Sequence, residues 1–564
     1  MRPWHLGNTT VRSPFRLRDG LVAISTSPLQ GDLRGEEQEK ALRTLLGEHG
    51  IVELGSDETY SVGRKWRSAL GKLGFLFPEL PGNLSVRQYE IGKPDSITPS
   101  GWRLVRAETV PAMQECFLRS LAAIYIPSPV ERGYDFTPFS PLRHTLSVMS
   151  ELERRTGDSL LNFIEMALVV QVSSTQDGVG KTVDFIINLR DLRKAAPNKR
   201  HFDQQEYNAA AARYDYKPLT FRDYADTNFR YLKATGLVNS RGKGISLVSE
   251  KRLFIDQLIH EKDTSATELE YFSNLCNGAR LPTDDASAAR EILDDLVAKA
   301  SSIGIVFDTQ SKILVDSADI AVARHEIEEL LSAHEEEVFA ANQATSWREI
   351  CLYMDLLIER RRSITTTEDD FIEIPQAEAP AYFEWTVWRA FLAIDSLVNR
   401  PFESRRFKID QDFRPVGTAP GGGPDLIFEF SDFVVVVEVT LTENSRQEAV
   451  EGEPVRRHVA DLVQLFSKPV YGLFIANRID SNTAETFRIG VWYDKEDQRK
   501  QLDIIPMTLV QFKTLFEAFF ANNRIEASLI REILDRCKVH RASNEAPAWK
   551  ILIQETITHF VEGL

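Results

Sequence analysis

The sequence predicts a multidomain protein whose first half is mainly α-helical and whose C-terminal part is an α/β domain. Three observations lead to this prediction. At 564 residues the chain is too long for a single hydrophobic core. Apolar residues recur at helical spacing through much of the first 345 residues. After residue 346, short β-branched runs alternate with helical segments, which is the pattern of an α/β core.

The first predicted domain, residues 1–150, opens with basic side chains among small polar ones. Arg12 and Arg16 follow a run of Asn and Thr, and Arg and Asn are side chains that can make bidentate contacts to base edges. We therefore expect both arginines to contact double-stranded DNA. The alternative is a solvated, frayed terminus.

A helix and a hairpin are expected next in this domain. The segment from Tyr60 leads into a helix that carries Arg64 and Lys65, two further candidate DNA contacts. Residues 97–104, ITPSGWRL, are expected to form a strand and a turn before another helix. Helices followed by a small hairpin are typical of a winged-helix element.

The second predicted domain, residues 151–261, contains a clearer element of the same kind. A helix begins near Thr220, and residues 237–248, LVNSRGKGISLV, are expected to follow it as a hairpin. The tip carries Arg241 and Lys243, which we expect to contact phosphate groups. A surface hairpin whose charges only favour solubility is the alternative.

One motif in this domain imitates a nucleotide-binding loop. Residues 178–182, GVGKT, follow a predicted apolar helix at 160–172. Thr175 stands where a Walker A loop needs its first glycine, and no long strand precedes the motif. We therefore expect an accidental likeness, with residues 182–192 helical. A nucleotide-hydrolysing protein would rest on this motif alone.

Residues 262–345 are expected to form a helical, acidic connector. Apolar residues recur at helical spacing over 288–298 and 318–341. The run of three glutamates at 335–337 is expected to be a solvated face rather than a metal site.

The charge of the chain is unevenly spread. The net charge is −16, which at first argues against a nucleic-acid partner because polyanions repel acidic surfaces. Residues 1–250 hold 33 Lys and Arg against 29 Asp and Glu, whereas the remaining residues hold 34 against 54. The first half is therefore mildly basic, which is compatible with a local DNA-binding face.

Composition also bounds the environment of the protein. The sequence has no apolar run of about 18 residues and no apolar signal segment at its start, so we expect no membrane partner. The four cysteines lie far apart without a CxxC pair, which disfavours zinc and fits a reducing, cytoplasmic compartment; they are Cys116, Cys276, Cys351 and Cys537.

The most informative stretch lies in the last predicted domain, residues 346–564. Two short runs, 426–430 and 434–437, are β-branched or aromatic and are separated by a Ser-Asp turn, so we expect a buried hairpin. The pairing brings Asp425, just before the first strand, close to Glu438, at the end of the second. A Glu behind four valines is rarely buried unless it is paired or binds a metal.

Further elements are expected around this hairpin. Strands flanked by helices on both faces would complete the α/β core. We expect helices at 347–359, 379–397 and 445–466, a strand at 470–476, a helix from Thr483, a strand at 503–507 and a helix capped by Thr508.

Two carboxylates at strand ends, with the carbonyl of Val439 beside them, make an all-oxygen site that suits Mg²⁺. Such an ion can polarise a phosphodiester and orient a water for in-line attack. The alternative for Asp425 is a turn residue with a purely structural role. The spacing resembles the PD-(D/E)xK nuclease signature, although Thr440 stands where that pattern has Lys.

Longer segments narrow this resemblance to one family. Residues 4–17, WHLGNTTVRSPFRL, resemble the opening segment of the AlwI family of type IIS restriction endonucleases and of related strand-specific nicking endonucleases. Four further segments resemble, in the same order, the catalytic domain of that family: FEW at 383–385, PVGTAPGGGPD at 415–425, EVT at 438–440 and EGEPVRRH at 451–458. The resemblance implies a PD-(D/E)xK-like nuclease domain at the C-terminus.

The resemblance also implies roles for individual residues. Glu384 and Glu451 would complete the acidic site, directly or through water, where each alone would be a solvated helix residue. His458 would face the scissile phosphate or hold a water. The family shares the change of Lys to Thr, so the general base stays open between Glu451, His458 and a metal-bound hydroxide. The implied metal ligands are Asp425, Glu438 and, through its carbonyl, Val439.

These expectations describe a Mg²⁺-dependent type IIS restriction endonuclease. The first half would recognise a short asymmetric DNA sequence, and the C-terminal domain would hydrolyse phosphodiester bonds a short distance outside it. One acidic cluster cuts one strand, so second-strand cleavage would need a transient homodimer or a small nuclease subunit. A nicking endonuclease and the large subunit of a heterodimeric restriction enzyme are alternatives. A non-catalytic winged-helix DNA-binding regulator is the alternative of another class.

Overall fold

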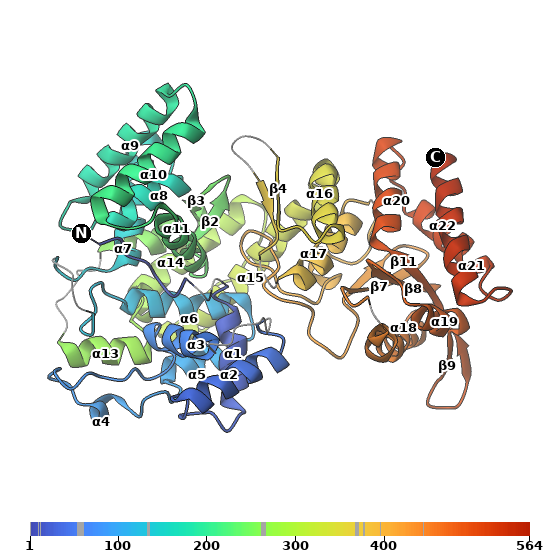
Figure 1. The fold of residues 1–564 in the computed structure, drawn as a ribbon, viewed down its shortest axis with the longest axis horizontal. Coiled ribbons are helices and arrows are strands. Elements are labelled where there is room, and N and C mark those ends of the chain that lie inside the picture. The colour runs from blue at the N-terminus through green and yellow to red at the C-terminus, as the bar shows by residue number, and fades with distance from the viewer. Residues whose placement is uncertain are drawn as a thin grey trace. The chain divides into compact units, whose positions relative to one another are not determined.

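The protein is mainly helical, with a small mixed sheet in its C-terminal part (Figure 1). The computed structural model describes residues 2–9, 11, 13–52, 61–131, 136–260, 267–366, 371–375, 378–394, 396–443 and 445–564. The chain divides into two compact units, Met1–Glu329 and Leu330–Leu564.

The first unit begins with short helices. They are α1 (Arg16–Ser25), α2 (Glu36–Glu48), α3 (Ser61–Lys72), α4 (Gln88–Ile91), α5 (Pro99–Arg106) and α6 (Val110–Ala123). The strand expected at 97–104 is wrong, because Thr98 accepts a hydrogen bond from the N–H of Gly101 and Pro99 occupies the first helical position of α5. A helix therefore stands where the first winged-helix element was expected to have its hairpin.

The hairpin expected at residues 237–248 is confirmed. β2 (Val238–Arg241) pairs antiparallel with β3 (Gly244–Leu247), directly after α11 (Pro218–Lys233). On its other side, β3 pairs with β1 (Leu161–Asn162). This last pairing corrects the helix expected at 160–172, because the ladder holds its first residues extended and α8 (Phe163–Leu168) begins only after them.

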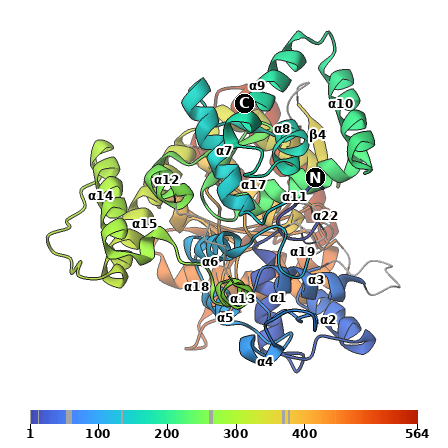
Figure 2. The same cartoon turned by 90° about the vertical axis from the view of Figure 1, so that its left-hand side faces the viewer.

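Further helices complete this part of the first unit. The segment after the GVGKT motif is helical, as expected, and forms α9 with α10 beside it (Figure 2). These helices are α7 (Pro141–Thr156), α9 (Val179–Ala195), α10 (Lys199–Tyr214) and α12 (Arg252–His260).

The acidic connector is helical, with one correction. It contains α13 (Glu268–Asn277), α14 (Ala286–Ser302) and α15 (Ser317–Ala341), and the boundary between the units falls within α15. Glu336 does not lie on a solvated face. It is 3% exposed and forms an ion pair with Arg405 at 2.7 Å, because a carboxylate that faces a core needs a cationic partner.

The second unit is built on a four-stranded sheet in the order β11-β8-β7-β6, of which Figure 1 labels β7, β8 and β11. β6 (Leu426–Glu429) and β7 (Val434–Thr440) form the expected antiparallel hairpin. β7 runs parallel to β8 (Val470–Ala476), and β8 runs parallel to β11 (Asp503–Thr508). Two small antiparallel pairs lie outside this sheet: β4 (Ser363–Thr365) with β5 (Phe371–Glu373), and β9 (Val491–Tyr493) with β10 (Arg499–Gln501).

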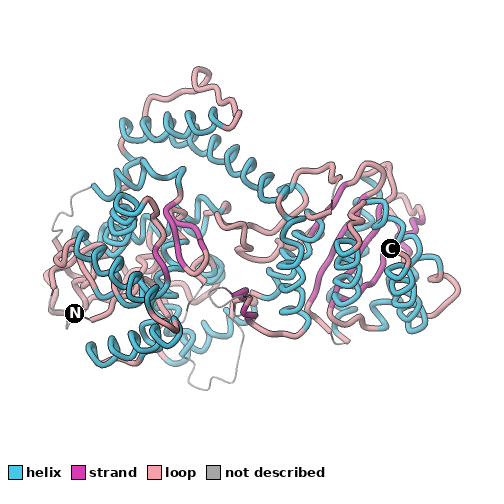
Figure 3. The backbone as a smooth tube through the Cα atoms, turned by 90° about the horizontal axis from the view of Figure 1, so that it is seen from above, coloured by secondary structure: helices cyan, strands magenta, loops and turns pink. Residues whose placement is uncertain are grey.

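Helices cover both faces of the sheet, so the strands run between helical layers (Figure 3). Val435 and Val437 pack into one hydrophobic core, whereas Val434 and Val436 pack into a second one on the opposite face. The first core is covered by α16 (Trp347–Ile358), α17 (Ala379–Leu392), α20 (Leu509–Ala521), α21 (Ala527–Val539) and α22 (Ala546–Glu562). The second is covered by α18 (Glu453–Leu465) and α19 (Ser481–Ile489).

Two helices of this unit differ from the expected bounds. Helix α17 ends at Leu392 rather than near residue 397. The helix expected at 445–466 begins with a π-helical turn, Glu448–Gly452, before α18. π-Helical turns are frequent at functional sites, and this one carries Glu451.

The four cysteines are buried and free of disulfides. Within the described part of the chain, no helix combines the length and the hydropathy needed to cross a membrane.

Candidate active site

Asp425 and Glu438 lie opposite one another at the end of the β6–β7 ladder. Leu426 pairs with Val437, so the next position of the same register sets Asp425 against Glu438. Alternation puts both side chains on the face of the sheet that α18 and α19 cover. The hairpin therefore brings two like charges together on one face, where Glu438 is only 7% exposed.

The backbone of Val439 fixes the first of these acids. Its N–H donates a hydrogen bond of 2.9 Å to Oδ2 of Asp425. The N–H and C=O of one strand residue point to the same side, so the carbonyl of Val439 also faces the β6 side, beyond the last paired residues. Two carboxylates and a backbone carbonyl thus lie at the same strand ends.

His458 reaches this face from α18. Its Nδ1 lies 2.6 Å from Oε1 of Glu438, and the imidazole is buried. With the proton on Nδ1, the ring donates to the carboxylate and leaves Nε2 as an acceptor. That Nε2 is buried and has no hydrogen-bond partner among the described residues.

Glu384 extends the acidic group from helix α17. It is 5% exposed, and its Oε2 accepts a hydrogen bond of 2.7 Å from the backbone N–H of Ala419. Ala419 belongs to the glycine-rich segment that precedes Asp425. A buried carboxylate on a helix rich in aromatic residues is thereby held against the loop that leads into β6.

Glu451, on the π-helical turn, is held by Thr440, which stands where the nuclease pattern has Lys. A hydrogen bond from the Thr440 side chain acts to lower the pKa of Glu451, although burial outweighs it and the pKa is raised. Residue 440 is the position at which the nuclease pattern has the ammonium group of Lys. In this chain the residue is Thr440, whose neutral hydroxyl group is a hydrogen-bond partner of Glu451.

The pKa values of the acids show that their charges are poorly compensated. Burial and the neighbouring Glu438 raise the pKa of Asp425 to about 8. Burial and Glu451 raise the pKa of Glu438 to about 8, and burial and Asp425 raise the pKa of Glu384 to about 9. The pKa of His458 is lowered by burial and then by Arg457. The five predicted residues therefore form one electrostatic cluster.

The donor set at this site has to match the Mg²⁺ that the sequence implies. In the described chain, no group of three or more Asp, Glu, His or Cys side chains is arranged so that it could hold a metal ion. Mg²⁺, however, is commonly held by one or two carboxylates and keeps several waters. Two neighbouring carboxylates whose pKa values are raised by burial and then by a nearby acid fit such an ion, because a bound cation would offset both effects.

Sequence reasoning missed Arg406, which belongs to the same neighbourhood. Its Nη1 donates to the carbonyl of Pro424, the residue before Asp425, at 3.4 Å. No local pattern marks Arg406 in the sequence, because the isolated bridge between Arg405 and Leu426 is what brings this segment beside Asp425.

The predicted DNA contacts come from three separate parts of the first unit. Arg16 is half-buried and donates to the carbonyl of Ile51 at 2.6 Å, which gives it a structural task. The others on described elements are Arg64 and Lys65 on α3 and Arg241 and Lys243 on the β2–β3 hairpin, where Arg241 pairs with Asp158 at 2.7 Å. Arg12 lies outside the described residues.

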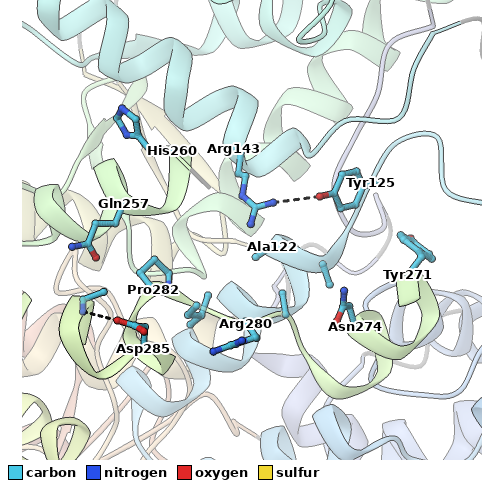
Figure 4. Close-up of a pocket in the computed structure, with 14 residues that line it drawn as sticks. Ala122, Tyr125, Arg143, Gln257, His260, Tyr271, Asn274, Arg280, Pro282 and Asp285 are labelled. Atoms are coloured by element: carbon cyan, nitrogen blue, oxygen red, sulfur yellow. Dashed lines mark hydrogen bonds between the residues drawn. The ribbon is translucent and has the colours of Figure 1, made fainter. Parts of the chain in front are cut away.

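The first unit also contains a cavity of about 750 Å³ between α12, α13 and the start of α14 (Figure 4). Its polar lining includes Arg143, which donates to the hydroxyl of Tyr125 at 3.4 Å, together with Arg280 and Asn274. None of the residues predicted to contact DNA lines it. The cavity is thus separate from the predicted DNA-contact residues.

Comparisons with known proteins bear on this site. A family model described as AlwI restriction endonuclease matches residues 71–515. Among solved structures, the small subunit of the heterodimeric restriction endonuclease R.BspD6I is similar with 25% identity, 37% of this chain and 97% of that chain covered, and a TM-score of 0.28. Restriction endonuclease FokI is similar with 12% identity, 95% and 98% covered, and a TM-score of 0.26. No curated protein matched the chain.

The protein is a type II site-specific deoxyribonuclease, which sets aside the non-catalytic regulator. The family match carries this assignment, since it spans most of the chain and includes every residue of the acidic cluster. The TM-scores of the two structural matches are too low to add to it. The chain belongs to the AlwI restriction endonuclease family, and it is a restriction endonuclease of type IIS.

Proposed function

We propose that the two units divide the work of a type IIS restriction endonuclease. Residues 1–150 and the winged-helix-like part at 151–261 recognise a short asymmetric sequence in double-stranded DNA. Residues 262–345 connect them to a PD-(D/E)xK-like nuclease domain at 346–564, which hydrolyses phosphodiester bonds outside that sequence. The basic tip of the β2–β3 hairpin supports the first assignment, and the acidic cluster supports the second. The enzyme would act in the cytoplasm.

The observation that carries the proposal is the pairing of Asp425 with Glu438 on one face at the end of the β6–β7 ladder. These two carboxylates, with the carbonyl of Val439, would hold Mg²⁺. When bound, Mg²⁺ stabilises the negative charge that develops on the phosphate during attack by water. The backbone N–H of Val439 orients Asp425 for this task, at 2.9 Å from its carboxylate.

Among the candidates for the general base, the geometry favours His458. Its contact with Glu438 holds the ring, and with the proton on Nδ1 the Nε2 atom would accept a proton from the attacking water. The burial of Nε2 without a described partner supports this role. Glu451, engaged with Thr440, and Glu384, engaged with Ala419, would add negative charge around the ion and hold waters.

One acidic cluster per chain hydrolyses one strand at a time. Double-strand cleavage would therefore need a second nuclease domain, from a transient second copy of this chain or from a small nuclease subunit. Nicking of a single strand is the outcome expected when neither is present.

The test is incubation of the protein with unmethylated plasmid DNA and Mg²⁺, followed by run-off sequencing of the products. We expect breaks at a fixed distance from one short asymmetric sequence. Breaks within the recognised sequence, or at random positions, would contradict the proposed division between recognition and cleavage. Strand-resolved reads distinguish nicking from double-strand cleavage, and their dependence on protein concentration shows whether a second copy takes part.

A further inference from the structure

Arg406 lies on an extended segment that continues the sheet beyond β6. Arg405 forms an isolated antiparallel bridge with Leu426, and the N–H of Ile427 donates to the carbonyl of Ser404 at 2.9 Å. The next position of this register sets Arg406 opposite Asp425. Because Asp425 is itself opposite Glu438, three side chains form one row across three neighbouring segments, on the same face of the sheet.

The neighbouring residue, Arg405, points to the opposite face of the sheet from Arg406. Successive side chains of an extended segment point to opposite faces. Arg405 therefore turns to the other face, where it pairs with the buried Glu336 at 2.7 Å and lies 5.7 Å from the ring centre of Trp388. The guanidinium of Arg405 is committed to the structure, whereas that of Arg406 is directed to the acidic face.

The contacts of Arg406 leave its guanidinium available for a ligand. It makes no ion pair with any carboxylate in the described chain, and its hydrogen bond there is the 3.4 Å contact to the carbonyl of Pro424. Gly423 makes room for it, since a Cβ at that position would come within 2.5 Å of Nη1. Burial raises the pKa values of Glu384 and Glu438, and Arg406 acts against that effect on both.

We propose that Arg406 binds a non-bridging oxygen of the scissile phosphodiester. This inference rests on the proposed function of the acidic cluster. Thr440, which replaces the Lys of the nuclease pattern, cannot supply a cation, and Arg406 lies in the row of the two proposed metal ligands. A guanidinium presents paired N–H donors that match phosphate oxygens, and its charge stabilises the charge that grows on them in the transition state.

The plain alternative is that Arg406 only holds the Gly423-Pro424 turn and so positions Asp425. The two roles differ in what the substrate contributes. If Arg406 contacts the phosphate, removing the charged oxygen from the substrate and removing the guanidinium from the protein must delete the same interaction. If Arg406 acts only on the turn, the effects of the two changes on the cleavage rate are independent, and their fold-reductions multiply.

The experiment uses the full-length protein, a short duplex with the mapped scissile position, and the same duplex with a methylphosphonate there. Single-turnover cleavage is measured for the wild type, Arg406→Gln and Arg406→Lys, with Arg499→Gln as the control, because Arg499 lies exposed on β10. We expect Arg406→Gln to slow cleavage of the normal duplex by about 10²–10³-fold, and Arg406→Lys to be intermediate, because it keeps the charge without the planar fork.

The decisive comparison is the sensitivity to methylphosphonate. This sensitivity is the cleavage rate of the normal duplex divided by that of the methylphosphonate duplex. The ratio should be large for the wild type and for Arg499→Gln, and at least about tenfold smaller for Arg406→Gln. Equal sensitivity of the wild type and Arg406→Gln, or an unchanged rate in Arg406→Gln, would overturn the inference. The melting temperature with and without Ca²⁺ is measured for the same proteins. If Ca²⁺ raises the melting temperature of the wild type but not that of Arg406→Gln, the inference is also overturned, since Arg406 would then be a positioning residue for Asp425.

These outcomes are distinct from a failure of the proposed function. Retained cleavage in Asp425→Asn would reject the acidic cluster as the active site, whatever Arg406 does. A cluster confirmed by Asp425→Asn, together with unaltered methylphosphonate sensitivity in Arg406→Gln, would reject the role of Arg406 alone.

Discussion

The carboxylate of Asp425 accepts a hydrogen bond of 2.9 Å from the backbone N–H of Val439. This contact ties the start of one strand to the end of its neighbour and sets the spacing between Asp425 and Glu438. Asp425→Asn keeps the size of the side chain and removes its charge. We expect cleavage to fall by about 10²–10³-fold or more while DNA binding persists, because charge stabilisation at the phosphate is lost.

Plasmid cleavage and gel-shift assays measure these two quantities. Glu429→Gln is the matched control, because Glu429 ends β6, which Asp425 directly precedes, and alternation gives both side chains the same face, but Glu429 pairs with Lys468 at 2.7 Å. It should cleave like the wild type. Full activity in Asp425→Asn, or an equal loss in both variants, would contradict the assigned role.

Divalent ions should stabilise the protein through the same two acids. An ion at about 100 times its dissociation constant stabilises a folded state by about 2.7 kcal/mol. We therefore expect Mg²⁺ or Ca²⁺ to raise the melting temperature of the wild type and not that of a variant with both Asp425→Asn and Glu438→Gln. An identical rise in both proteins would place the ion elsewhere.

The buried pair of Glu336 and Arg405 should be costly to break. Arg405→Met leaves the carboxylate of Glu336 buried without its partner, so we expect the free energy of unfolding to fall by about 3–5 kcal/mol. Chemical denaturation measures it. As a control, Arg524→Gln disrupts an exposed pair with Glu526 and should cost at most about 1 kcal/mol. Equal effects would mean that Glu336 is solvated after all.

Acid should destabilise the first unit through His144. Burial lowers the pKa of His144 to about 4, against 6.5 when unfolded, and its Nε2 lies 2.9 Å from Oγ of Ser173. Because the folded-state pKa is depressed, the unfolded chain binds more protons between these values. Stability is therefore full above pH 6.5 and falls by about 1.4 kcal/mol per pH unit as pH drops towards 4.

The free energy of unfolding of the wild type and of His144→Gln, measured between pH 6.5 and 4, tests this prediction. The variant should show a shallower loss of stability on acidification. A slope as steep as that of the wild type would show that other groups cause the acid sensitivity.

The hairpin tip should contribute to DNA affinity and not to sequence preference. Lys243 is exposed between β2 and β3, so Lys243→Ala should weaken binding to all duplexes alike and reduce the slope of log affinity against log salt by about 1. Lys181→Ala, in the GVGKT motif, is the control and should change neither the DNA affinity nor the salt slope. Titrations at several salt concentrations decide it, and an unchanged slope in Lys243→Ala would remove the hairpin from the interface.

The sequence predicts the hairpin of the second unit well because its information is local. Two β-branched or aromatic runs separated by a Ser-Asp turn specify the strands and their pairing, and therefore the neighbourhood of Asp425 and Glu438. Other features depend on partners that are distant in the chain. Leu161 is extended because it pairs with Ile245, and Glu336 is buried because Arg405 lies beside it.

The same reasoning explains what was missed at the site. Arg406 joins the acidic row through a bridge between Arg405 and Leu426, which no periodicity in a single segment reveals. The helix at 99–106 was readable from Thr98 and Pro99, a cap followed by a residue suited to the first turn. A strand and a turn were expected there instead, although the N–H of Gly101 donates to the side chain of the cap residue Thr98.

Anomalous diffraction from crystals soaked with Mn²⁺ tests the central claim most directly. We predict a single strong peak about 2.0–2.3 Å from carboxylate oxygens of both Asp425 and Glu438, with the carbonyl of Val439 beside it. A strong peak elsewhere, with none between these two acids, would contradict the proposal that they share a divalent ion.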